Sequence, residues 1–322
     1  MKSKPNLYAP LLIGAILILA GVSAPLISFL QTISQGSFLA ITIVQLLVFL
    51  LPLAFYSRVR GLNPLNVLKF GYPPLKKIPF LIVMILIFFT GILFFRYLGL
   101  FLVDSAFLET PDIISLPEDG GNRILMVLCT VFLPAILEET VFRGILLEEY
   151  RSYGSFFAVG VTSVMFALAH LSFENFLYYL FVGAMLGCIV QVCDTVLPAI
   201  LIHIAMNASY FSLRPSVVEY LRQAGKSPLL LYLIVAALIL LFVLLFSRLE
   251  NLYQDRAYDE MLQSRKELLR KEVEYARLQR NREETPDPKE KFTKKCKEVF
   301  LSPTFLATCA IFLILASGLF SE

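Results

Sequence analysis

Long apolar stretches, separated by short polar ones, follow one another along the first 247 residues of the chain. Crossing the hydrocarbon core of a bilayer takes about 20 apolar residues in a helix. By that measure the sequence predicts membrane spans near residues 8–30, 37–56, 78–103, 124–147, 155–171, 175–192, 195–212, 228–247 and 302–320. The stretch 172–196 is also compatible with a re-entrant segment. We therefore expect an all-α, polytopic transmembrane helix bundle, with about eight core spans and an added C-terminal span.

A long polar segment separates the last two predicted spans. Its first part, about 248–284, has leucines at helical spacing among many charges, and Pro286 and Pro288 end that pattern. This pattern is compatible with a partner-binding coiled coil, with a helix on the lipid surface and with a solvated helical spacer. The chain thus divides into a bundle (1–247), whose candidate chemistry falls at about 120–212, a charged and largely helical linker (248–300) and a C-terminal helix (301–322).

Composition supports lipid as the main solvent of the chain. Hydrophobic residues make up 57% and charged residues 16%, whereas a soluble domain has about 25% charged residues. Half of the positive charge, 14 of 28 Lys and Arg, lies between Arg248 and Lys297. We expect an integral multi-pass membrane protein whose partners are the bilayer and a membrane-associated protein or peptide, with no nucleic acid.

The loop charges predict an orientation, because Lys and Arg accumulate in cytoplasmic loops. Lys2 and Lys4 precede the first span, and the second loop is basic, whereas the third, 104–122, carries only acidic charges before Arg123. This alternation predicts a cytoplasmic N-terminus and a cytoplasmic linker. The segment 213–227 fits less well, since it is predicted outside despite its basic residues. The short loops suggest a prokaryotic plasma membrane.

Four of the ionisable residues inside predicted spans stand out, because charge in the membrane is costly and usually functional. They are the two histidines of the chain, His170 and His203, and the adjacent acids Glu138 and Glu139. On a helix Glu139 and Arg143 share one face and can form an ion pair, while Glu138 points about 100° away. Glu138 is then left for catalysis, although a structural ion-pair network of both acids with Arg143 is the alternative.

Asn207 lies one helical turn beyond His203, on the same face. Two chemistries fit a Glu, two His and an Asn in one cavity. In the first, Glu138 and His170 activate a water molecule, and His203 and Asn207 donate hydrogen bonds to the oxyanion. In the second, Glu138, His170 and His203 bind a divalent metal such as zinc, which acidifies its water. Spacing does not distinguish these two mechanisms.

These residues form three ordered motifs, Glu138-Glu139-x-x-x-Arg143, Phe166-x-x-x-His170 and His203-x-x-x-Asn207. Together they resemble the CPBP (ABI) family of type II CAAX-prenyl endopeptidase-like membrane proteases, over about 125–210. The glycines at 144, 183 and 187 and the Leu-Pro pair at 197–198 also resemble that family. Residues 1–100 match only as hydrophobic spans, and the linker with the last span looks like an addition.

The resemblance implies an intramembrane endopeptidase. It assigns water activation to Glu138 and His170, the oxyanion site to His203 and Asn207, and a supporting role to Glu139 and Arg143. It also leaves open a glutamate mechanism without metal, which we favour, and a metal-assisted one. Two other classes compete. A non-catalytic scaffold of bacteriocin-immunity or regulatory type would retain the same cluster, and a transporter would use it as a proton relay, although no internal repeat supports the latter.

Overall fold

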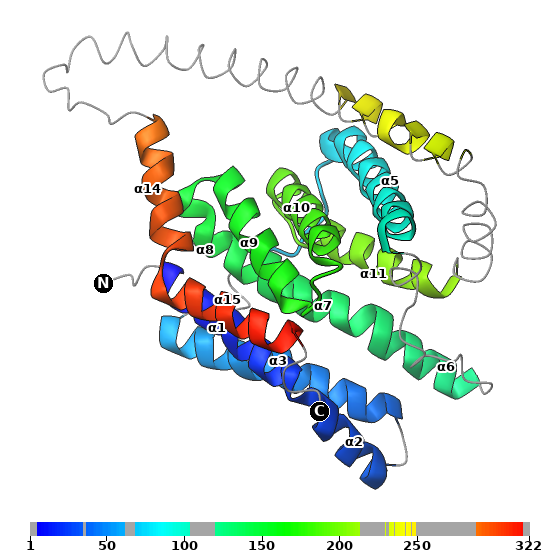
Figure 1. Cartoon of the computed structure of the whole chain (residues 1–322), viewed down its shortest axis with the longest axis vertical. Helices are drawn as coiled ribbons and strands as arrows, with labels where there is room; N and C mark the ends of the chain where they lie inside the picture. Colours follow the sequence, from blue (N-terminus) through cyan, green and yellow to red (C-terminus); the bar gives the residue numbers. More distant parts are fainter. Residues whose placement is uncertain are drawn as a thin grey trace, which may run out of the picture.

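The structure, a computed structural model, describes residues 5–34, 37–61, 68–103, 120–212, parts of 229–248, and 288–317. Within these ranges the chain forms helices joined by turns, without any strand (Figure 1). The predicted all-α bundle is thereby confirmed. The acidic loop up to residue 119, the segment 213–228 and the linker up to residue 287 lie outside the described residues, so the orientation and the linker's role stay predictions.

Four helical segments of the described chain are long and apolar enough to cross a membrane, namely Phe38–Arg60, Ile78–Phe95, Ile124–Tyr153 and Phe176–Cys193. They belong to α3 (Ser37–Arg60), to α5 (Ile78–Val103), to the helical run 120–153 and to α10 (Phe176–Cys193). α10 is a continuous helix and one of these candidate spans, while the re-entrant alternative for the stretch 172–196 stays a prediction. The number rises to six if each of two bent helix pairs counts as one span. The nine-span count therefore stays a prediction, because α9 (Ser155–Ala169) and α11 (Leu197–Ser212) are shorter apolar helices.

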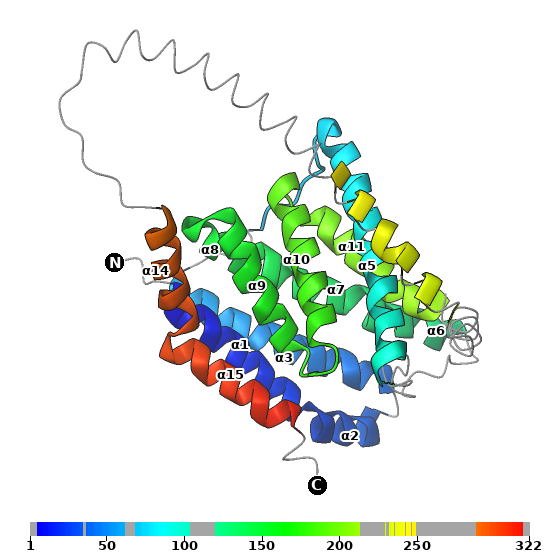
Figure 2. The same cartoon turned by 45° about the horizontal axis from the view of Figure 1, so that its top comes forward.

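The two bent pairs lie near the two ends of the chain. α1 (Pro5–Gly21) and α2 (Ser23–Ser34) meet at 46°, and α14 (Pro288–Phe300) and α15 (Pro303–Ala316) meet at 54°. The second bend has a local cause, because Ser302 is extended and its side chain caps α15 by accepting from the Phe305 amide. α1 and α15 lie side by side (Figures 1 and 2), and the Thr308 hydroxyl donates to the Pro10 carbonyl over 2.7 Å.

The run 120–153 changes its hydrogen-bond pattern several times. It consists of α6 (Gly120–Val127), the π-helix η2 (Leu128–Phe132), α7 (Leu133–Glu139), the π-helix η3 (Thr140–Leu146), α8 (Leu147–Tyr150) and the 3₁₀ turn η4 (Arg151–Tyr153). Pro134 explains the first change, since it has no amide hydrogen for the carbonyl one turn earlier. π-helical segments occur often at functional sites, and here they flank the Glu138–Glu139 pair on both sides.

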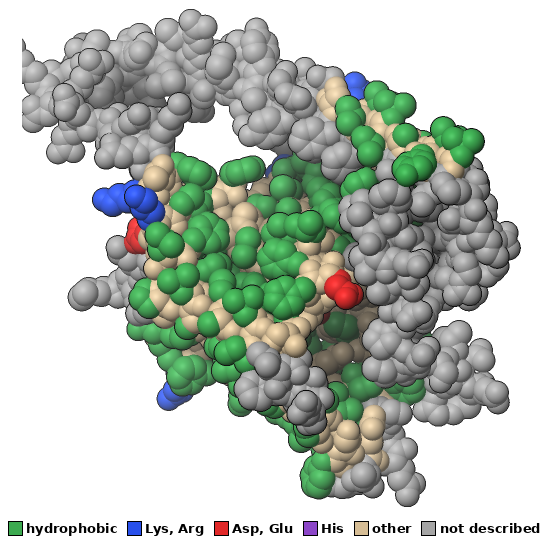
Figure 3. All heavy atoms as spheres, in the orientation of Figure 1, with side chains coloured by type: hydrophobic (Ala, Val, Ile, Leu, Met, Phe, Trp, Pro, Cys, Tyr) green, Lys and Arg blue, Asp and Glu red, His purple; other side chains and the backbone are tan. Residues whose placement is uncertain are grey.

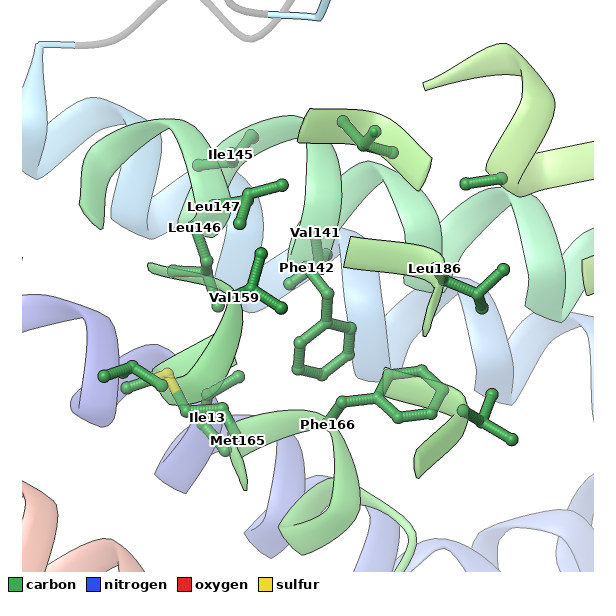
Figure 4. Packing of buried hydrophobic residues seen from close by; sticks show 14 of the residues in the cluster. Ile13, Val141, Phe142, Ile145, Leu146, Leu147, Val159, Met165, Phe166 and Leu186 are labelled. Carbon is green, nitrogen blue, oxygen red and sulfur yellow. The ribbon is translucent and has the colours of Figure 1, made fainter. Parts of the chain in front are cut away.

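The interior around this run is packed with apolar side chains. The rings of Phe142 and Phe166 point toward one another in Figure 4, with centroids 5.2 Å apart in a T-shaped arrangement. Hydrophobic side chains are also spread over the described part of the face shown in Figure 3, and helices such as α3 and α5 expose large ones. An apolar exterior on helices of spanning length is what a protein solvated by lipid requires.

Candidate functional site: an acid–histidine cluster between α7, α9 and α11

The predicted ion pair forms the buried base of the site. Arg143 Nη1 donates to Glu139 Oε1 over 2.8 Å, and the two side chains are 1% and 0% exposed. The guanidinium also donates to the Gly183 carbonyl over 3.1 Å and lies 4.3 Å from the ring centre of Phe166. His203 is the second partner of Glu139, because its Nδ1 lies 2.8 Å from the same Glu139 oxygen. Glu139 is therefore an anchor shared by Arg143 and His203.

His170 ends α9 and turns its ring back along the helix. Its Nδ1 lies 2.8 Å from the Phe166 carbonyl, and a carbonyl oxygen can only accept, so Nδ1 holds the hydrogen. Its backbone still has helical angles, while the next residue, Leu171, has a left-handed φ of 51° that stops the helix. In the neutral imidazole, this geometry leaves His170 Nε2 without a hydrogen, and it directs Nε2 away from its own helix.

Both histidines converge on Glu138. The Oε2 atom of Glu138 lies 3.7 Å from His170 Nε2 and 3.9 Å from His203 Nε2. These separations exceed a direct hydrogen bond and suit a bridging water molecule. Glu138 Oε2 is buried and has no hydrogen-bond partner within the described part of the chain. The geometry thus leaves Glu138 with a carboxylate oxygen available for chemistry, beside two imidazole nitrogens.

Asn207 lies one turn beyond His203 on α11, as its spacing predicts. Its Nδ2 donates to the Val131 carbonyl over 3.2 Å. Val131 lies in the π-helix η2, where the shifted hydrogen-bond pattern accompanies Pro134. One of the two amide hydrogens of Asn207 is sufficient for this bond, so the other is available to a ligand. The structure therefore brings all four predicted catalytic residues and both supporting residues into one region.

The metal alternative was tested against the same geometry. In the described ranges, no three His, Cys, Asp or Glu side chains are placed as a group that could hold a metal ion. The Nδ1 bonds of both histidines resemble those of metal-bound histidines, yet Glu138, His170 and His203 do not form a coordination set as they stand. We derive no catalytic step through a metal, and the metal dependence stays a prediction.

Besides the Nδ1 bonds of His203 to Glu139 and of His170 to the Phe166 carbonyl, three further contacts of the site were not predicted from the sequence. Two of them involve backbone groups, the carbonyls of Gly183 and Val131. The pattern of side chains along the sequence does not predict which backbone carbonyl accepts a hydrogen bond. The third is Tyr179, whose ring stacks on His170 with centroids 3.7 Å apart and planes 22° from parallel. Only the glycine at 183 carried a signal, through its place in the family resemblance.

Comparison with known proteins agrees with this site. Residues 120–209 match the family model described as type II CAAX prenyl endopeptidase Rce1-like. Neither the curated proteins nor the solved structures give a match. The matched range includes the helical run 120–153 and all six residues of the predicted site. The apolar helices and the matched family together indicate an integral membrane protein and a peptidase acting on a membrane-associated protein. Over residues 120–209, the chain is thus similar to the type II CAAX prenyl endopeptidase Rce1-like family.

Proposed function

We propose that this protein is an intramembrane endopeptidase that hydrolyses a peptide bond of a membrane-associated protein or peptide by a glutamate mechanism. The observation that carries the proposal is the buried Oε2 of Glu138, which lacks a hydrogen-bond partner among the described residues and faces His170 Nε2 at 3.7 Å. A carboxylate and an unprotonated imidazole nitrogen at this separation can both accept from one water molecule, and they raise its nucleophilicity.

The proposed reaction begins when this water attacks the scissile carbonyl carbon and gives a proton to Glu138. The carbonyl oxygen becomes an oxyanion, which the free amide hydrogen of Asn207 and Nε2–H of His203 stabilise. Glu138 then passes its proton to the departing amine, and the C–N bond breaks. Since Nδ1 of His203 donates to Glu139, an Nε2 donor requires a doubly protonated ring. Glu139 would stabilise that positive charge.

The short loops before the linker suggest a prokaryotic protein. A prokaryotic source favours a membrane-bound peptide or a lipoprotein-like substrate over a prenylated protein. The test compares peptides and new protein termini in membranes from cells that express the wild type or Glu138→Gln at matched levels. The matched control is Glu148→Gln, a partly exposed carboxylate of the same helical run that pairs with Lys69 and Arg151.

Products that appear with the wild type and Glu148→Gln but not with Glu138→Gln would support the proposal and identify the substrate. Identical profiles, with all proteins well expressed, would instead favour the scaffold or immunity function. His170→Ala and His203→Ala should likewise abolish cleavage. A chelator should leave the rate unchanged, and a loss that zinc restores would favour the metal-assisted mechanism.

A further inference from the structure

The ring of His170 has a neighbour that belongs to none of the three motifs. Tyr179, half-buried in the first turns of α10, stacks almost parallel on the imidazole, with centroids 3.7 Å apart. The ring of Phe166 approaches the same imidazole at 4.5 Å and 54°. Together with the bond from Nδ1 to the Phe166 carbonyl, these contacts restrict both the position and the tilt of the ring.

The register of α9 against α10 explains why Tyr179 reaches His170. The two helices run antiparallel, and a Cβ at Gly183 would lie 3.0 Å from the Ser163 Cα, while one at Gly187 would lie 3.2 Å from the Val159 side chain. Each step of four residues forward along α9 therefore matches a step of four backward along α10. The next step places Tyr179 opposite Ala167. Because alanine is small, the tyrosine ring can extend past it to His170.

We propose that Tyr179 is a positioning residue, which holds the imidazole of His170 so that Nε2 faces Glu138. The idea rests on the proposed function for its catalytic consequence, whereas the stacking itself can be tested without catalysis. Without Tyr179, the bond to the Phe166 carbonyl would still restrain Nδ1, but the ring would be free to tilt about that bond. The distance from Nε2 to Glu138 would then vary.

The direct test uses the fact that the chain has two histidines. Diethylpyrocarbonate acylates unprotonated imidazole nitrogens, and mass spectrometry of the full chain in detergent follows each histidine. His203, with a side chain 3% exposed, is the internal reference for His170, which is 20% exposed. We expect diethylpyrocarbonate to modify His170 about tenfold faster in Tyr179→Leu than in the wild type, because the loss of one aromatic pair has an effect of this size. Tyr179→Phe should stay within about twofold, because it keeps the stacked ring.

Catalysis provides the second readout. Tyr179→Leu should lower kcat about tenfold or more with little change in KM, since a misdirected base affects the chemical step. Tyr179→Phe should have a kcat close to that of the wild type. Leu177→Ala changes an exposed position of the same helix and should also resemble the wild type. If Tyr179→Leu does not fold, Tyr179→Met takes its place.

Equal modification of His170 in all variants would overturn the proposal, and so would a Phe variant as impaired as the Leu variant. The modification rate does not require peptidase activity. A wild-type protein without peptidase activity would therefore count against the proposed function alone. The modification rates of His170 would still show whether Tyr179 positions its ring.

Discussion

At the scale of single residues, the site depends on one buried carboxylate with two basic partners. Arg143 and His203 both lie 2.8 Å from Oε1 of Glu139, and all three side chains are at most 3% exposed. A buried ion pair adds little stability compared with apolar packing, but removing one partner leaves an uncompensated charge. The cluster therefore ties α7 to α11 and also orients His203.

Arg143→Ala should reduce the amount of folded protein, because it removes one of the two groups that compensate the negative charge of Glu139 in a region of low dielectric constant. Losing one partner of a buried pair typically costs about 3–5 kcal/mol. Thermal unfolding in detergent and the yield of monodisperse protein measure this effect. The control is Arg151→Ala, since Arg151 is 27% exposed and its pairs with Glu148 and Asp194 are worth little. A well-folded but inactive Arg143→Ala protein would contradict the assignment of Glu139 to structure and Glu138 to catalysis.

Asn207→Ala should lower kcat about 10²–10³-fold, the usual effect of losing one oxyanion donor. Folding should change less, because the bond to the Val131 carbonyl is a single neutral one of 3.2 Å. Asn207→Asp keeps the shape of the side chain and removes both donors, so we expect it to be at least as inactive. A rate within a few fold of the wild type for either variant would remove Asn207 from the oxyanion site.

At the scale of elements, the antiparallel pair of α9 and α10 sets the distances within the site. Gly183 lets the two backbones approach closely, and its carbonyl accepts from Arg143. Close approach at small residues is a common way for helices to pack in membranes, where dispersion and interhelical hydrogen bonds replace the hydrophobic effect. His170, at the end of α9, and Tyr179, on α10, are brought together by the same packing.

Gly183→Ala should destabilise the protein and lower its activity. The new Cβ would lie 3.0 Å from the Ser163 Cα, a backbone atom, so the helices would have to separate. Overpacking of this kind costs about 1–3 kcal/mol. Gly160→Ala is the matched control, because a Cβ there meets nothing within 4 Å. Equal melting temperatures for the two variants would show that α9 and α10 tolerate a wider spacing.

The elements also show where prediction from the sequence stops. The pair of Glu139 and Arg143 was predicted, because spacing by four residues on a helix leaves little choice. The π-helices were not predicted, since they depend on small shifts of backbone hydrogen bonds, and Pro134 accounts only for the first of them, η2. The apolar run 124–147 was recognised as a span, yet the structure extends it to Tyr153 and interrupts its hydrogen-bond pattern.

At the scale of the whole molecule, the C-terminal helix packs near the site. The ring centre of Phe312 on α15 lies 5.0 Å from that of Phe173, in the connection that follows His170, and 6.0 Å from that of Phe176, at the start of α10. The sequence presented this helix as an addition to the family core. The structure places it against α1 (Figure 1) and against the turn that follows His170.

Phe312→Ala should therefore lower both thermal stability and activity. Removing a buried phenylalanine ring usually costs about 3–5 kcal/mol in a packed core, and part of that loss would loosen the turn beyond His170. Leu313→Ala is the control on the neighbouring, 53% exposed position. Unfolding curves and cleavage rates of both variants measure the effect. Activity that is fully retained in Phe312→Ala would show that α15 does not support the site.

The sequence by itself determined the helical, membrane-embedded class of the protein and predicted the six residues of a candidate site. Both follow from local rules, namely the length of apolar runs, the expense of charge in lipid and the periodicity of a helix. Tertiary structure alone decided the contacts between helices, such as His203 with Glu139, Tyr179 with His170 and α15 with the turn beyond His170. These contacts join residues far apart in the chain or on separate helices, and they arise from packing complementarity, which hydrophobic periodicity does not encode.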